Sequence, residues 1–298
     1  MLAVVLSMTK PSLGKEPPST KLPTMAEVIS NSTSVDWKAI DPENTLYVDL
    51  KKGRVVIELA PVFAPNTVAN VKALVRDGYY EGIRINRVQD NRVVAWEFPD
   101  ADQTNMARRI KHGKSTLPPE FERMIDPALP FTRLPDGDVY APEVGFCGDF
   151  PAGRDPQSGK MWLLHEYGMV GVGRDNALDS GGGTELYVII GQAPRDLDRN
   201  VTLIGRVVQG MEFLTALPRG TGDMGYYVKP SQYVKIKSIR VASDVPPAKR
   251  TNLEVMRTET PAFHDLIESR RNRREDWFRI AAGKIEIVNV PIPVRPVH

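Results

Sequence analysis

Alternating apolar and polar positions recur along much of the chain and predict a β-rich fold. TLYVDL at residues 45–50 and RVVIEL at residues 54–59 both alternate with period two and flank a Lys-Lys-Gly break, which is typical of a β-hairpin. The strand-like run GIRINRVQDNRVVAWE follows at residues 82–97. Further strands are expected at residues 168–173, 184–190 and 200–208, and around YYVKP and YVKIKSIRVA.

Helical periodicity is confined to short stretches between these strands. APNTVANVKALVRDGYY places Pro65 in a first helical turn and Gly78 where a helix stops. The apolar residues between them fall on one face of a helix of about three turns, namely Val68, Val71, Leu74 and Val75. A second, shorter helix is expected at GMEFLTAL, before the last strands.

The order of these elements indicates a barrel. Roughly eight strands and two helices lie between residues 44 and 243, and the connections are too short for parallel crossovers. Closure removes the exposed sheet edges, so we expect a mainly β fold, an eight-stranded antiparallel closed barrel capped by two α-helices.

The remaining segments are additions to this domain. Residues 1–43 are expected to form an N-terminal arm or linker, partly disordered, because residues 8–24 are rich in Pro, Ser and Lys. The Pro-rich passage at about 98–160 reads as a long loop insertion. Residues 244–298 are expected to form a C-terminal extension of one helix followed by an extended segment. The apolar side of that helix comprises Phe263, Leu266, Ile267, Trp277 and Phe278.

Composition narrows the class of protein. The 298 residues are 41% hydrophobic with a net charge of +2 and scattered basic residues, so we expect a folded core and no nucleic-acid partner. Cys147 is the single cysteine, which excludes an intramolecular disulfide. No run approaches the roughly 18 apolar residues of a membrane span. The apolar stub MLAVVLSM and the Pro-rich arm slightly favour a periplasmic or exported location over the cytoplasm.

Motifs typical of nucleotide-binding proteins, metalloenzymes and hydrolases are weak or missing. Gly168, Gly171 and Gly173 lack the third glycine of a dinucleotide loop and the helix that should follow it. The four histidines are spread without ligand spacing, and no nucleophile elbow is present. We therefore expect neither a metal site nor a hydrolase triad.

Several longer motifs resemble the cyclophilin-type peptidyl-prolyl isomerases over about residues 44–243. The resemblance is carried by APNTVANVKALVRDGYYEG, HEYGMVGVGR, TELYVIIGQAPRDLDRN and LIGRVVQGM, of which the first and last match most closely. It implies an eight-stranded barrel with two capping helices, a prolyl pocket on the outside and no metal or organic cofactor. The family's Phe-His-Arg-Val strand reads Ile85-Asn86-Arg87-Val88 here, so Arg87 corresponds to the catalytic arginine.

The pocket departs from the family pattern at several positions. Arg92 replaces an aromatic floor residue, Ala95 a glutamine of the catalytic strand and Glu185 a second glutamine. The tryptophan associated with cyclosporin binding corresponds to Asp196, so weak or absent cyclosporin binding is expected. The residues expected to contact substrate are Val93, Ala95, Gly173, Arg174, Glu185, Tyr187, Leu197 and Ile204.

The resemblance implies catalysed rotation of Xaa-Pro bonds in unfolded or flexible protein or peptide clients. Such rotation requires weakened amide resonance rather than an acid or nucleophile, and a fixed guanidinium can supply this. The main alternative is a catalytically poor peptide-binding or chaperone module on the same barrel. A structural subunit that uses the insertion and the C-terminal helix to bind a partner is a third possibility. The oligomeric state stays open.

Overall fold

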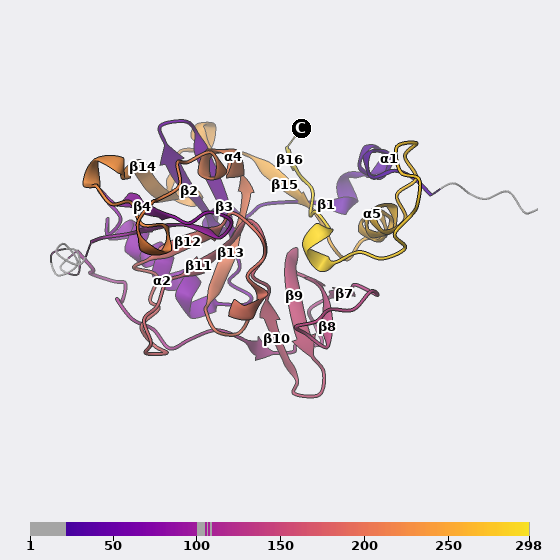
Figure 1. Ribbon diagram of the computed structural model, residues 1–298, viewed down its shortest axis with the longest axis horizontal. Helices are drawn as coiled ribbons and strands as arrows, with labels where there is room; N and C mark the ends of the chain where they lie inside the picture. Colours follow the sequence, from indigo (N-terminus) through magenta and orange to yellow (C-terminus); the bar gives the residue numbers. More distant parts are fainter. Residues whose placement is uncertain (1–21, 100–104, 106, 108, 298) are drawn as a thin grey trace, which may run out of the picture.

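A computed structural model describes residues 22–99, 105, 107 and 109–297, and its centre is a closed antiparallel barrel (Figure 1). The strand order is β11-β12-β5-β4-β14-β2-β3-β13, which confirms the eight-stranded barrel expected from the strand pattern. The strands are β2 (Thr45–Leu50), β3 (Arg54–Leu59), β4 (Arg84–Val88), β5 (Val93–Glu97), β11 (Met169–Val172), β12 (Leu186–Ile189), β13 (Leu203–Gln209) and β14 (Val234–Val241).

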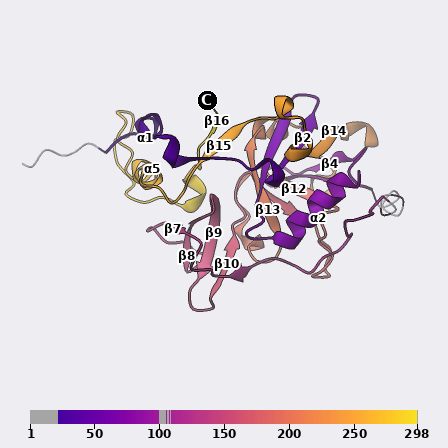
Figure 2. The ribbon, with the colours of Figure 1, turned by 180° about the vertical axis from the view of Figure 1, so that it is seen from behind.

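Two helices of the barrel domain lie where the sequence predicts them. α2 (Pro65–Arg76) begins at its proline and buries Val68, Val71 and Leu74 against the core inside the barrel. α4 (Met211–Thr215) is a short helix that contacts β3. Figure 2, seen from behind, shows α2 running across the barrel.

The passage expected to be a loop insertion forms a five-stranded antiparallel sheet instead. Its order is β6-β10-β9-β8-β7, and a tight turn at Gly148 and Asp149, both with positive φ, joins β8 to β9. Prolines interrupt the alternation of apolar and polar residues along this passage. The sheet is therefore defined by pairing between strands rather than by a local sequence pattern. The strands are β6 (Arg123–Met124), β7 (Phe131–Arg133), β8 (Glu143–Cys147), β9 (Phe150–Asp155) and β10 (Lys160–Leu163).

The described parts of the N-terminal and C-terminal segments form one module beside this sheet (Figure 1). Residues 1–21 of the expected arm lie outside the described residues, but the remainder is ordered and carries a helix and a strand. α1 packs on α5, and β15 pairs with both β1 and β16. The elements are α1 (Met25–Asn31), β1 (Trp37–Ala39), β15 (Leu253–Met256), α5 (Pro261–Arg271) and β16 (Val294–Pro296).

The C-terminal helix is shorter than its expected apolar side implies. α5 ends at Arg271, and Trp277 is 81% exposed. No apolar residue lies between Ile267 and Trp277, so the helix has no side chains that would extend its buried face beyond Ile267.

Candidate functional site

Arg87 lies near the end of β4, opposite Ala95 of β5. Its Nε–H donates to the carbonyl oxygen of Met224 at 2.8 Å and its Nη2 donates to Oε1 of Gln89 at 2.7 Å. The guanidinium carbon lies 5.4 Å from the centre of the Tyr226 ring. These contacts use two of the five guanidinium N–H groups, and the described part of the chain engages no other. Arg87 is therefore held in place with donors to spare.

A groove of about 1250 Å³ opens beside this guanidinium on the outside of the barrel. Val93, Tyr187, Leu197 and Val201 contribute apolar surface to it. Most of the residues expected from the sequence line this groove, namely Arg87, Val93, Gly173, Arg174, Glu185, Tyr187 and Leu197.

Two of the expected contact residues are not among those lining the groove. Ile204 has no exposed surface and belongs to the core inside the barrel, so its expected contact with substrate is wrong. Its neighbour Leu203 belongs to the outer cluster instead, because side chains alternate between the two faces of a strand. Ala95 packs in that same outer cluster and is 1% exposed.

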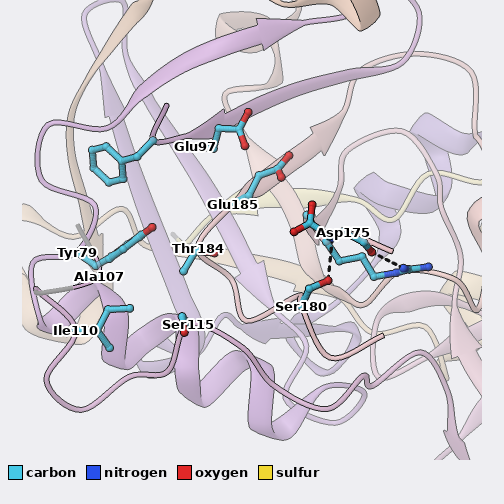
Figure 3. A pocket seen from close by; sticks show the side chains of 12 residues that line it. Tyr79, Glu97, Ala107, Ile110, Ser115, Asp175, Ser180, Thr184 and Glu185 are labelled. Carbon is cyan, nitrogen blue, oxygen red and sulfur yellow. Dashed lines mark hydrogen bonds between the residues drawn. The ribbon is translucent and has the colours of Figure 1, made fainter. Parts of the chain in front are cut away.

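A smaller cavity of about 360 Å³ adjoins the groove (Figure 3). Glu97, Gly173, Arg174, Asp175 and Glu185 line both spaces. These shared residues make the groove and the cavity neighbours along one surface. A chain extended past the guanidinium can therefore place adjacent side chains in both.

Glu185 lines both spaces, and Figure 3 shows it among the side chains of the smaller cavity. Its carboxylate occupies the volume that a Cβ on Gly173 would take, so glycine at that position is what gives it room. Burial raises the pKa of Glu185 to about 7; the charge of Glu97 adds to the rise, and Arg87 opposes it. The carboxyl is therefore poised to change charge near neutral pH.

Arg174 and Tyr187 are each tied to their surroundings. Arg174 donates from Nε to the carbonyl oxygen of Asn200 at 2.8 Å, so its charge faces a neighbouring loop. The Tyr187 ring lies over Gly171 of the adjacent strand, in space that any side chain there would fill. Its hydroxyl lies 3.1 Å from Nε2 of His165, and burial raises its pKa well above the usual range.

The residues that position the arginine, directly or through Tyr226, were missed in the sequence. Gln89 and Tyr226 contact Arg87 directly, and Tyr226 also donates its hydroxyl to Glu97 at 2.9 Å. Glu97 could have been found, because it continues the alternation of Val93 and Ala95 along β5. Tyr226 comes from a turn far away in the chain and carries no local signal.

The described residues contain no group of three His, Cys, Asp or Glu side chains arranged to hold a metal ion. Within the same ranges, no helix combines the length and hydropathy needed to cross a bilayer.

Comparison with known proteins agrees with this geometry. The family model for the cyclophilin type peptidyl-prolyl cis-trans isomerase matches residues 45–241. Proteins named "Probable peptidyl-prolyl cis-trans isomerase" from Brucella suis and Brucella abortus are 28% and 27% identical to the chain over 204 residues, covering 66% of this chain and 83% of each relative.

A solved structure extends the likeness beyond the barrel. The cyclophilin AquaCyp293 from Hirschia baltica superimposes with a TM-score of 0.69 at 26% identity, covering 91% of this chain and 97% of that one. This coverage exceeds that of the barrel domain, so the added sheet and terminal module belong largely to the shared architecture. The chain therefore belongs to the cyclophilin family and is a peptidyl-prolyl cis-trans isomerase.

Proposed function

We propose that Arg87 is the catalytic residue of this isomerase. Rotation of a prolyl bond faces a barrier of about 18–20 kcal/mol that comes from amide resonance. A guanidinium that donates to the prolyl carbonyl, and toward the ring nitrogen as its lone pair localises, stabilises the twisted amide more than the planar one. The observation that carries this assignment is the fixed orientation of Arg87, with Met224 and Gln89 holding one side and free donors left for the groove.

The groove supports binding of the proline ring beside this arginine. Val93, Tyr187, Leu197 and Val201 offer an apolar surface, and burying apolar area stabilises by about 25 cal/mol per Å². Arg92 also lines the groove, where the family resemblance places an aromatic residue. Its long aliphatic stem can pack on a proline ring while its charged end stays in water.

The shape of the groove favours extended chains as clients. It is open to solvent and shares lining residues with the smaller cavity, so several consecutive residues can lie across it. We therefore propose that the clients are unfolded or flexible segments whose Xaa-Pro bond can enter the groove, in keeping with a role in protein folding. The periplasmic or exported location stays a prediction.

Weak or absent cyclosporin binding is part of the same proposal. Asp196 stands where the resemblance places the tryptophan associated with cyclosporin. A carboxylate at this position offers no aromatic surface to an apolar cyclic peptide.

The test is an NMR measurement of cis-trans exchange on short Ala-Pro and Phe-Pro peptides, comparing the wild type with Arg87→Ala. We expect the variant to lose at least tenfold in kcat/KM, which corresponds to about 1.4 kcal/mol of transition-state stabilisation. Arg84→Ala is the matched control, since Arg84 lies exposed on the same strand.

Two results would contradict the assignment. Equal activity of the two arginine variants would remove Arg87 from the catalytic role. A wild type that accelerates neither peptide, but binds both as well as a proline-free peptide, would favour the peptide-binding module instead.

A further inference from the structure

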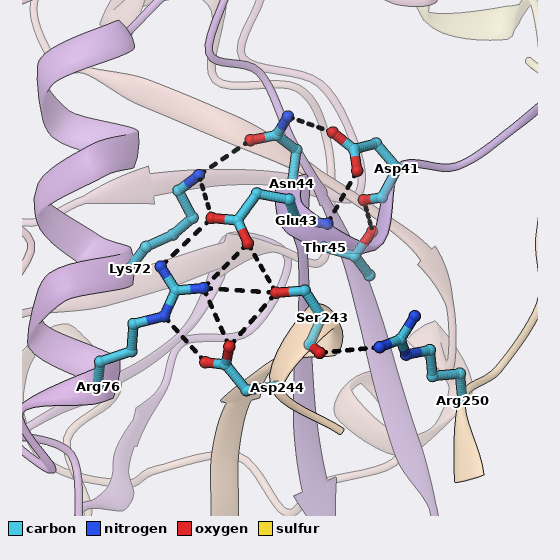
Figure 4. A network of polar contacts seen from close by, with 9 residues as sticks. All are labelled: Asp41, Glu43, Asn44, Thr45, Lys72, Arg76, Ser243, Asp244 and Arg250. Carbon is cyan, nitrogen blue, oxygen red and sulfur yellow. Dashed lines mark hydrogen bonds and ion pairs between the residues drawn. The ribbon is translucent and has the colours of Figure 1, made fainter. Parts of the chain in front are cut away.

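Among the polar networks that the described residues form outside the contacts of Arg87, two join the barrel to distant segments of the chain. One joins Arg76 of α2 to Glu43 and to Asp244 (Figure 4). Its arginine and both carboxylates are 42–44% exposed. This network ties the capping helix to the chain segments that enter β2 and leave β14, so barrel closure accounts for it.

The second network is buried and ends at the floor of the groove. Nη1 and Nη2 of Arg195 donate to Oδ1 and Oδ2 of Asp138 at 3.0 and 2.9 Å, and Nε donates to Oδ2 of Asp198 at 2.5 Å. Oδ1 of Asp198 accepts the backbone N–H of His165 at 2.8 Å and lies 3.1 Å from its Nδ1. Nε2 of His165 then reaches the Tyr187 hydroxyl. We call these five residues the polar chain.

The donor and acceptor atoms along the polar chain can be assigned from its carboxylates. A carboxylate only accepts hydrogen bonds, so Nδ1 of His165 carries the proton that Asp198 receives. In the neutral imidazole, Nε2 then accepts a hydrogen bond from the Tyr187 hydroxyl. Each link therefore fixes the orientation of the next, ending at the aromatic ring.

The polar chain joins two parts of the fold that are distant in sequence. Asp138 lies between β7 and β8 of the inserted sheet, Arg195 opens the 3₁₀ helix Arg195–Leu197, and Tyr187 lies on β12 of the barrel. All of its side chains are at least nine-tenths buried. Apolar packing runs parallel to it, because Tyr187 shares a cluster with Phe150 and Met161 of the inserted sheet.

The hydroxyl of Tyr187 explains why such a chain is needed. The family resemblance places phenylalanine at this position, and a phenylalanine ring needs no polar partner. A buried hydroxyl without a partner is destabilising, whereas a hydrogen-bonded one restrains the ring. Buried polar networks of this kind favour one arrangement over its alternatives.

We propose that Asp138, Arg195, Asp198 and His165 are positioning residues that fix the Tyr187 ring as the floor of the proline site, so that the inserted sheet sets substrate affinity. This rests on the proposed role of the groove in binding proline. The insertion thereby acts on the reaction without touching the substrate.

The test compares Asp138→Asn with Asp136→Asn in the full-length chain. Asp136 is the matched control, since it lies in the same loop and accepts two hydrogen bonds from Arg271 of α5, but it does not join the polar chain. We expect Asp138→Asn to raise KM for an Xaa-Pro peptide about three- to tenfold with kcat within about twofold. Asp136→Asn should leave both within about twofold of the wild type.

A double-mutant cycle separates positioning from general loosening. In a Tyr187→Phe background there is no hydroxyl to hold, so Asp138→Asn should no longer change KM. Arg195→Lys, which keeps the charge but not the two-pronged contact, serves if Asp138→Asn fails to fold, and it should behave in the same way. A KM change of equal size in both backgrounds, or in both aspartate variants, would overturn the proposal. Wild-type activity and the Arg87→Ala result are independent of this outcome.

Discussion

Removal of Gln89 tests whether orientation of the Arg87 guanidinium contributes to the rate. Oε1 of Gln89 accepts a hydrogen bond from Nη2 of Arg87 at 2.7 Å. Hydrogen bonds to charged groups contribute about 1.5–3 kcal/mol. This one is only partly buried, and Met224 still holds Nε, so we take about 1 kcal/mol as its share. That value corresponds to roughly fivefold in rate.

We therefore expect Gln89→Ala to lower kcat about fivefold and to change KM little, because the apolar surfaces of the groove stay intact. The measurement is initial-rate kinetics on an Ala-Pro peptide in a protease-free assay. Gln157→Ala, at an exposed turn between β9 and β10, is the control for a generic loss of glutamine.

The decisive comparison is made in the Arg87→Ala background. If Gln89 acts through Arg87, its removal there should have no further effect. A fivefold loss that persists without Arg87 would refute the reasoning, as would full activity of the single Gln89→Ala variant.

Three further predictions follow from buried groups near the groove. Burial raises the pKa of Glu185 to about 7, so kcat/KM should fall as pH rises through 7 and negative charge builds near Arg87; an unchanged pH profile for Glu185→Gln would contradict this. Burial also raises the pKa of Glu166 from 4.5 to about 8, so the folded chain retains a proton that the unfolded chain releases, and stability in urea should decline from pH 4.5 to 8. Glu166→Gln should flatten that decline. Gly171→Ala should displace the Tyr187 ring and raise KM several-fold, with a folded circular dichroism spectrum as the check.

The barrel strands were predictable because each has one face in a continuous core. Residues 45–50 and 54–59 place every second residue in the barrel core, including Leu46, Val48, Val55 and Ile57. Both strands begin and end at the expected residues. α2 likewise begins at Pro65 as expected. The sequence did not show which residues of a strand face the inside of the barrel and which face the outside. Leu203 and Ile204 are both apolar, and only closure of the barrel decides that Ile204 points inward.

The strands of the inserted sheet and of the terminal module lacked comparable local signals. Short strands such as Phe131–Arg133 exist because a partner strand lies beside them. The same holds for Trp37–Ala39, which pairs with a strand more than two hundred residues further along the chain.

By itself, the sequence determined the barrel, the capping helix α2 and the position of Arg87, because hydrophobic periodicity and short motifs are local properties. Only the tertiary structure decided how that arginine is held, since Gln89 is near it in sequence but Met224 and Tyr226 are not. The link from Asp138 to Tyr187 is likewise a product of folding. Burial in a low-dielectric interior makes each polar group require a partner, and the folded chain supplies those partners from distant segments.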